Sequence, residues 1–103
     1  MTSFVDLSGA SGAHYRFRAW SDAGQTPMAG NFVVTELDAG AQTQLLLIGL
    51  TDDLSKVRPH VTAAGLGDRP VFVRLNVARQ TREHEHEDLT ARYSSARVLD
   101  LSA

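Results

Sequence analysis

Hydrophobic and polar positions alternate with a period of two along much of this chain, which is the pattern of strands that bury one face. From His14 to Trp20, aromatic and small apolar residues alternate with two arginines. The shorter apolar stretch Phe4–Leu7 precedes it, and a cluster of glycine and serine, a turn signal, separates the two. We therefore predict an N-terminal β-hairpin over residues 4–20.

Three further stretches predict strands. Asn31–Glu36 is rich in β-branched and aromatic residues. Gln44–Ile48 ends in an unbroken apolar run, which indicates burial on both faces. Val71–Val77 alternates cleanly. Gly30 and Gly49 lie at strand ends, where glycine allows a tight turn or a close approach of another group.

Two segments have the spacing of helices. The first follows Thr51, a residue that can cap a helix, and places Leu54, Val57 and Val61 on one face. Pro59 falls inside this segment, so we expect the helix to kink or stop near Arg58. The second runs from about Arg82 to Arg92, and no element is predicted for the tail after it. The expected order is β-hairpin, β, β, α, β, α.

Composition narrows the class of protein. The chain has 103 residues, of which 43% are hydrophobic and 21% charged, as expected for one folded domain spanning 1–103. It has no cysteine, which excludes disulfides and thiolate metal sites. The N-terminus lacks a signal-peptide pattern, and no apolar run is long enough for a membrane, so we expect a cytoplasmic protein. The net charge of −2 argues against a protein that coats nucleic acid.

Several short motifs occur in an informative order. They are Gly30-Asn31-Phe32, Leu47-Ile48-Gly49, the helix start Thr51–Leu54, and an acidic helix that leads to Asp88-Leu89 and Tyr93. In this order the chain resembles the GIY-YIG nuclease superfamily, and more specifically short bacterial GIY-YIG-like proteins with an additional N-terminal hairpin. The resemblance implies an α+β fold in which a small antiparallel sheet is flanked by helices, with a core over about residues 28–93. It also implies DNA as a partner.

The resemblance implies chemistry that the chain does not fully support. Such nucleases cut phosphodiester bonds with one divalent metal ion, using tyrosine hydroxyls, an arginine on the first helix and a metal-binding glutamate. Here Phe32 and Leu47 replace the tyrosines, Val57 replaces the arginine, and His86 replaces the glutamate. Two later positions, usually proline and asparagine, are Ser95 and Val98. We therefore expect an impaired nuclease that keeps the fold for binding nucleic acid or protein.

Two alternatives stay open. An active endonuclease could use a relocated site, with Arg58, His60 and Glu85 as catalytic residues and Mg²⁺ or Mn²⁺ held by Glu85, His86 and Glu87. A transition metal could instead be bound by His84, His86 and an acid. The competing interpretation of this charged run is a solvated first turn of a helix.

The candidate binding residues follow the same motifs. They are Gly30, Phe32, Ile48, Gly49 and Arg74, from the three central predicted strands. The partner is expected to be DNA, another protein, or a second copy of the chain joined at a free sheet edge.

Overall fold

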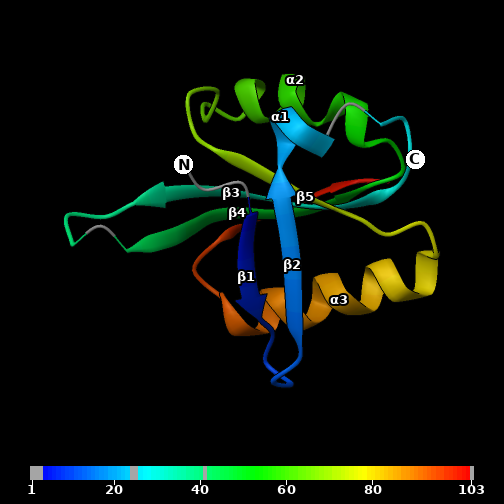
Figure 1. Ribbon diagram of the computed structural model, residues 1–103, viewed down its shortest axis with the longest axis horizontal. Coiled ribbons are helices and arrows are strands. Elements are labelled where there is room, and N and C mark those ends of the chain that lie inside the picture. Colours follow the sequence, from blue (N-terminus) through cyan, green and yellow to red (C-terminus); the bar gives the residue numbers. More distant parts are fainter. Residues whose placement is uncertain (1–3, 24–25, 41, 103) are drawn as a thin grey trace.

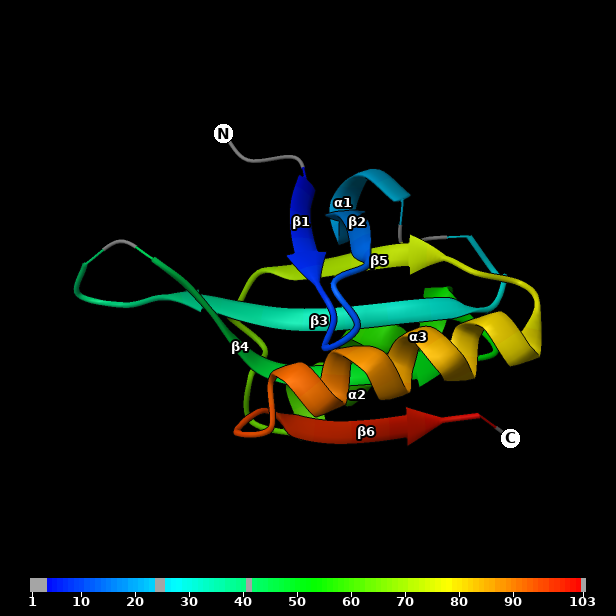
Figure 2. The same ribbon diagram turned by 90° about the horizontal axis from the view of Figure 1, so that it is seen from below.

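The computed structural model describes residues 4–23, 26–40 and 42–102, and within them six strands form one mixed sheet with helices on both faces (Figures 1 and 2). The strands are β1 (Phe4–Ser8), β2 (His14–Ala19), β3 (Gly30–Leu37), β4 (Thr43–Thr51), β5 (Val71–Leu75) and β6 (Arg97–Leu101). The helices are α1 (Trp20–Ala23), α2 (Val57–Ala63) and α3 (Arg79–Arg92), with the 3-10 turn η1 (Leu54–Lys56) leading into α2. The predicted α+β class and the N-terminal hairpin are confirmed.

The strand order is β1-β2-β5-β3-β4-β6. Neighbouring strands are antiparallel except β4 and β6, which are parallel. The expectation of an antiparallel sheet is therefore wrong at this edge. The reason is β6, which forms from the tail for which no element was predicted. A parallel partner needs a long crossover connection, and the chain between β4 and β6 supplies one through α2, β5 and α3.

Each face of the sheet carries its own apolar cluster. Residues on alternate positions of β3 point to opposite faces, so Phe32 and Val33 belong to different clusters. Phe32, with Leu47 and Val71, packs against η1 and α2. Val33, with Ile48 and Phe72, packs against Leu89 of α3 and against the inner face of the β1–β2 hairpin. Figure 1 shows α1 and α2 above the sheet and α3 below it.

The helix boundaries differ from the predicted ones for local reasons. Pro59 neither kinks nor ends α2, because it is the third residue of the helix, where the backbone N–H has no partner within the helix. The capping residue before η1 is Asp53, whose side chain accepts from the N–H of Ser55 at 3.0 Å. α3 begins at Arg79, three residues before the predicted start. None of the helices in the described parts of the chain is long and apolar enough to cross a membrane.

Candidate functional site

The α2 face of the sheet holds three of the positions that the nuclease resemblance assigns to catalytic groups, whereas the metal-ligand position, His86, lies on α3. Phe32, Leu47 and Val57 are at most 2% exposed and lie in one apolar cluster. The resemblance implies two tyrosines and an arginine at these three positions. A dry cluster of this kind offers no partner for a hydroxyl, a charge or a reacting water. The chemistry implied by the resemblance therefore has no groups to perform it at these positions.

The two motif glycines serve this packing. A Cβ at Gly49 would meet the ring of Phe32 and would lie 2.7 Å from the carbonyl oxygen of Leu99 in β6. A Cβ at Gly30 would meet the carbonyl of Arg74 and would lie 2.8 Å from Leu54. Both glycines thus allow the chain to pack closely on itself. Ile48, also a predicted binding residue, is 1% exposed on the other face. These four predicted binding positions, Gly30, Phe32, Ile48 and Gly49, are enclosed in the fold.

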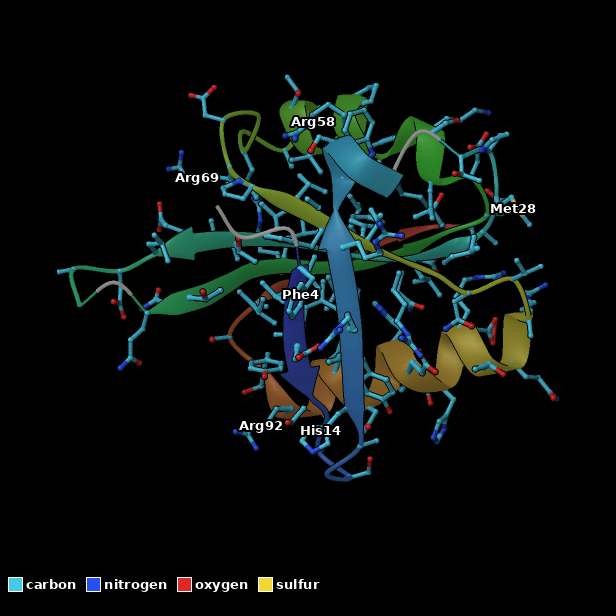
Figure 3. All side chains as sticks on the ribbon, viewed as in Figure 1. Phe4, His14, Met28, Arg58, Arg69 and Arg92 are labelled. Atoms are coloured by element: carbon cyan, nitrogen blue, oxygen red, sulfur yellow. The ribbon has the colours of Figure 1, made fainter. Side chains whose placement is uncertain are left out.

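Arg58 and His60 lie on α2, which packs on the same side of the sheet as that dry cluster. Figure 3 shows Arg58 on that side. Arg58 donates from Nη1 to the carbonyl oxygens of Gly67 at 3.1 Å and Arg69 at 3.2 Å. Its guanidinium also stacks over the ring of Trp20 at 5.4 Å. Arg58 therefore ties the loop after α2 to the helix. His60 is exposed to solvent.

The α3 face carries a buried polar network that joins the sheet to the helix. Glu85 accepts at Oε1 from Arg74 Nε at 2.7 Å and from Asn76 Nδ2 at 2.9 Å. The Asn76 amide also donates to Asn31 Oδ1 at 2.9 Å. Asn31 in turn donates to the main-chain carbonyl of Arg82 at 3.1 Å. Glu85 is therefore an ion-paired, hydrogen-bonded carboxylate that fixes α3 over β3 and β5.

Arg82 completes the network at the start of α3. It is 6% exposed, and its Nη1 donates to the carbonyl oxygens of Asn76 at 3.1 Å and Val77 at 2.9 Å. These bonds hold the β5–α3 connection against the helix. Sequence reasoning missed the roles of Asn31 and Arg82. The available signal was a polar residue next to the apolar run of a strand, as Asn31 is beside Phe32–Val34 in β3.

A second polar cluster attaches the tip of the β1–β2 hairpin to α3. The carboxylate of Asp88 accepts from the N–H of Ser11 at 2.8 Å, the hydroxyl of Ser11 at 2.7 Å and the hydroxyl of Tyr15 at 2.7 Å. The Ser11 and Tyr15 bonds lower the pKa of Asp88. Burial and the bond to Asp88 raise the pKa of Tyr15 to about 12. Tyr15 therefore stays protonated near neutral pH and is unsuited to activating a water.

The predicted metal ligands lie in different surroundings along α3. Glu85 is held in the buried network, whereas Glu87 is exposed. His86 is half-buried, its Nδ1 is enclosed without a partner, and burial lowers its pKa. Within the described ranges, no three His, Cys, Asp or Glu side chains are grouped to hold a metal ion. Metal binding at Glu85, His86 and Glu87 stays a prediction.

The sheet separates the proposed members of the relocated nuclease site. Arg58 and His60 lie on the α2 side, whereas Glu85, His86 and Glu87 lie on α3 at the opposite face (Figure 1). The expected convergence of Arg58, His60 and Glu85 in one cleft is therefore not formed. The physical reason is that α2 and α3 each bury an apolar side against a different face of the sheet.

A groove beside β1 is a concave feature of the described surface. It consists of three hollows with volumes of about 180, 380 and 360 Å³. Val5 lines the first two, Tyr93 lines the last two, and Thr43 lines all three. The hollows are therefore contiguous, between edge strand β1 on one side and the β3–β4 hairpin and the end of α3 on the other.

Comparison of this chain with protein-family models, with curated proteins and with solved structures finds no match.

Proposed function

We propose that this chain is a GIY-YIG-like domain without nuclease activity that acts by binding another protein. The observation that carries the proposal is the dry cluster of Phe32, Leu47 and Val57 at the positions of the nuclease's catalytic groups. Transition-state stabilisation in phosphodiester hydrolysis requires charges and donors aimed at the phosphate, and hydrocarbon side chains supply neither.

The distribution of arginine favours a protein partner over nucleic acid. Within the described residues, four arginines pair with carboxylates, namely Arg16, Arg69, Arg74 and Arg79. Three more donate to main-chain carbonyls, namely Arg58, Arg82 and Arg97. Binding to a phosphate backbone depends on cations free to neutralise it, and the net charge of the chain is −2. A concave surface with mostly uncharged lining residues, such as the groove beside β1, suits a protein better.

A nicking assay on supercoiled plasmid tests the absence of nuclease activity. Wild-type protein is incubated with Mg²⁺, with Mn²⁺ and with chelator, beside a His60→Gln/Glu87→Gln double variant. Both residues are exposed, so the variant is expected to fold, and circular dichroism checks this. We expect no nicking above the chelator background from either protein. Metal-dependent nicking that the double variant loses would establish an enzyme and overturn the proposal.

A further inference from the structure

We propose that the groove beside β1 binds an extended segment of a partner protein, which adds to the sheet as a new strand next to β1. The inference rests on the proposed protein-binding function and specifies its site. It is carried by three features of the molecule: a free sheet edge, a continuous groove along that edge, and the charge of the groove.

The free edge is the outer side of β1. The sheet order places β1 at one end, and among the described residues its strand partner is β2 alone. In an antiparallel pair, every second residue directs its N–H and C=O away from the partner strand. β1 therefore presents main-chain donors and acceptors that an extended peptide can satisfy. Strand addition of this kind gains affinity from the main chain and specificity from pockets for alternate side chains.

The groove has the form that such a strand requires. Val5, Asp6 and Leu7 are consecutive residues of β1, and together they line one wall of the middle hollow. The hollows before and after it continue the groove toward Phe72 and toward Ser95. Pockets for compact small molecules usually measure about 300–1,000 Å³ and enclose their ligand. Here no single enclosed pocket is formed by the three hollows, which lie open in a row, and such a row suits the alternate side chains of a strand better.

The charges in the groove indicate the chemistry of the segment. Asp6 is the one carboxylate among the lining residues, and Arg16 neutralises it at 2.8 Å. The remaining lining side chains are apolar or uncharged, so the inward positions of the segment should be apolar. Arg92 stacks on Tyr93 at 5.8 Å, beside the last two hollows, and forms no ion pair with the described carboxylates. A carboxylate at that end of the segment would pair with it.

Two substitutions that add the same charge distinguish binding in this groove from binding elsewhere on the surface. Thr43 is exposed and lines all three hollows, so Thr43→Arg fills the groove without entering the core. Thr62 is exposed on α2, on the other side of the sheet, so Thr62→Arg is the matched control. Ser95→Arg blocks the far end of the groove and serves as a second variant if Thr43→Arg folds poorly.

The experiment selects peptides of about 12 random residues, displayed on phage, against the wild-type protein, with counter-selection against Thr43→Arg. An enriched peptide is synthesised with a fluorophore, and its affinity is measured by anisotropy. We expect alternating apolar residues with an acidic residue near one end. We expect Thr43→Arg to weaken binding at least about tenfold, Arg92→Gln about threefold, and Thr62→Arg less than about twofold. Hydrogen exchange should slow at the β1 amides when the peptide binds.

The possible failures are distinguishable. Peptides that bind wild type and Thr43→Arg equally, or no enrichment over the counter-selection, would overturn the groove as the site and leave the nicking result unaffected. A wild-type dimer that Thr43→Arg dissociates, seen by sedimentation, would overturn the partner segment in favour of a second copy of the chain. Metal-dependent nicking would instead overturn the proposed function, whatever the peptides do.

Discussion

The two faces of the sheet are stabilised in different ways. Under α2, the sheet buries a cluster made entirely of hydrocarbon and aromatic side chains, with Phe32 at its centre. Under α3, an apolar cluster is bordered by Asn31, Asn76, Arg82 and Glu85, all 9% exposed or less. The same three strands, β3, β4 and β5, supply side chains to both faces. The difference therefore lies in which residues of each strand point to each face, and in which side chains α2 and α3 place against them.

This difference shows where a polar group can be accommodated. On the α3 face, Asn31, Asn76 and Glu85 hydrogen-bond to one another or to a main-chain carbonyl, so the cost of removing them from water is offset. Two enclosed nitrogens on this face, Nε of Arg82 and Nδ1 of His86, have no such partner among the described residues. On the α2 face, the cluster offers no such partner. A nuclease site at the motif positions would need hydroxyl and guanidinium groups on the face that is least able to hold them.

The sharpest way to test the contrast is to add one hydroxyl to each face. Phe32→Tyr adds a hydroxyl on the α2 face, where the ring tip lies against Gly49. We expect the free energy of unfolding to fall by about 3 kcal/mol, because the hydroxyl is both crowded and without a partner. The measurement is urea unfolding followed by circular dichroism.

Phe72→Tyr is the matched substitution on the α3 face. Phe72 lines the open groove beside β1, so its added hydroxyl can reach water. We expect this variant to lose less than about 1 kcal/mol. If Phe32→Tyr were as stable as Phe72→Tyr, the α2 face would not be the dry, closely packed surface described above.

The second test removes a polar partner from the α3 face. Glu85→Ala leaves Arg74 and Asn76 without their shared acceptor, and we expect the free energy of unfolding to fall by about 2–3 kcal/mol, since Arg74 keeps partial contact with water. Glu85→Gln keeps an acceptor oxygen of the same shape and should lose less. The measurement is again urea unfolding.

Arg74→Ala provides the control for this coupling. If Glu85 and Arg74 act together, the Glu85→Ala/Arg74→Ala double variant should be more stable than the sum of the two single losses predicts. Additive losses would show that the 2.7 Å contact contributes little beyond packing.

The strands could be predicted from the sequence because most of them carry their own pattern. β2 alternates between apolar and polar residues, whereas β3 and β5 are rich in β-branched and aromatic residues. Neither signal depends on the neighbouring strands. β6 is different, since it has five residues and its Val98 is 58% exposed. Its position depends on pairing with β4, with Val98 beside Ile48, and on Leu99 packing against the α2-side cluster. Neither contact is local in sequence, so the tail gave no strand signal.

The candidate site could be predicted only in part, for a related reason. The sequence singled out Glu85, Arg74 and Arg58 as groups with functional potential. It does not specify which face of the sheet each helix covers, because an apolar side on a helix does not by itself identify the surface against which it packs. Glu85 and Arg74 do meet, through the register that sets Asn31 beside Arg74, whereas Arg58 lies across the sheet. Which of these side chains meet therefore depends on how the strands and helices pair in the fold.

The last test concerns pH and the cluster that attaches the hairpin to α3. The pKa of Tyr15 is raised from 10.0 to about 12, so the folded state favours the protonated hydroxyl. This contribution to stability is complete below pH 10 and is lost as the pH rises toward 12. We expect the loss to reach at most about 2 kcal/mol.

Tyr15→Phe has no group to titrate there and should be less stable than wild type at neutral pH, because Asp88 loses a donor. Urea unfolding of both proteins across this pH range should show the wild-type advantage shrinking. An advantage that stays constant through pH 12 would mean that the hydroxyl of Tyr15 titrates as it does in the unfolded chain, and that its bond to Asp88 does not hold the hairpin on α3.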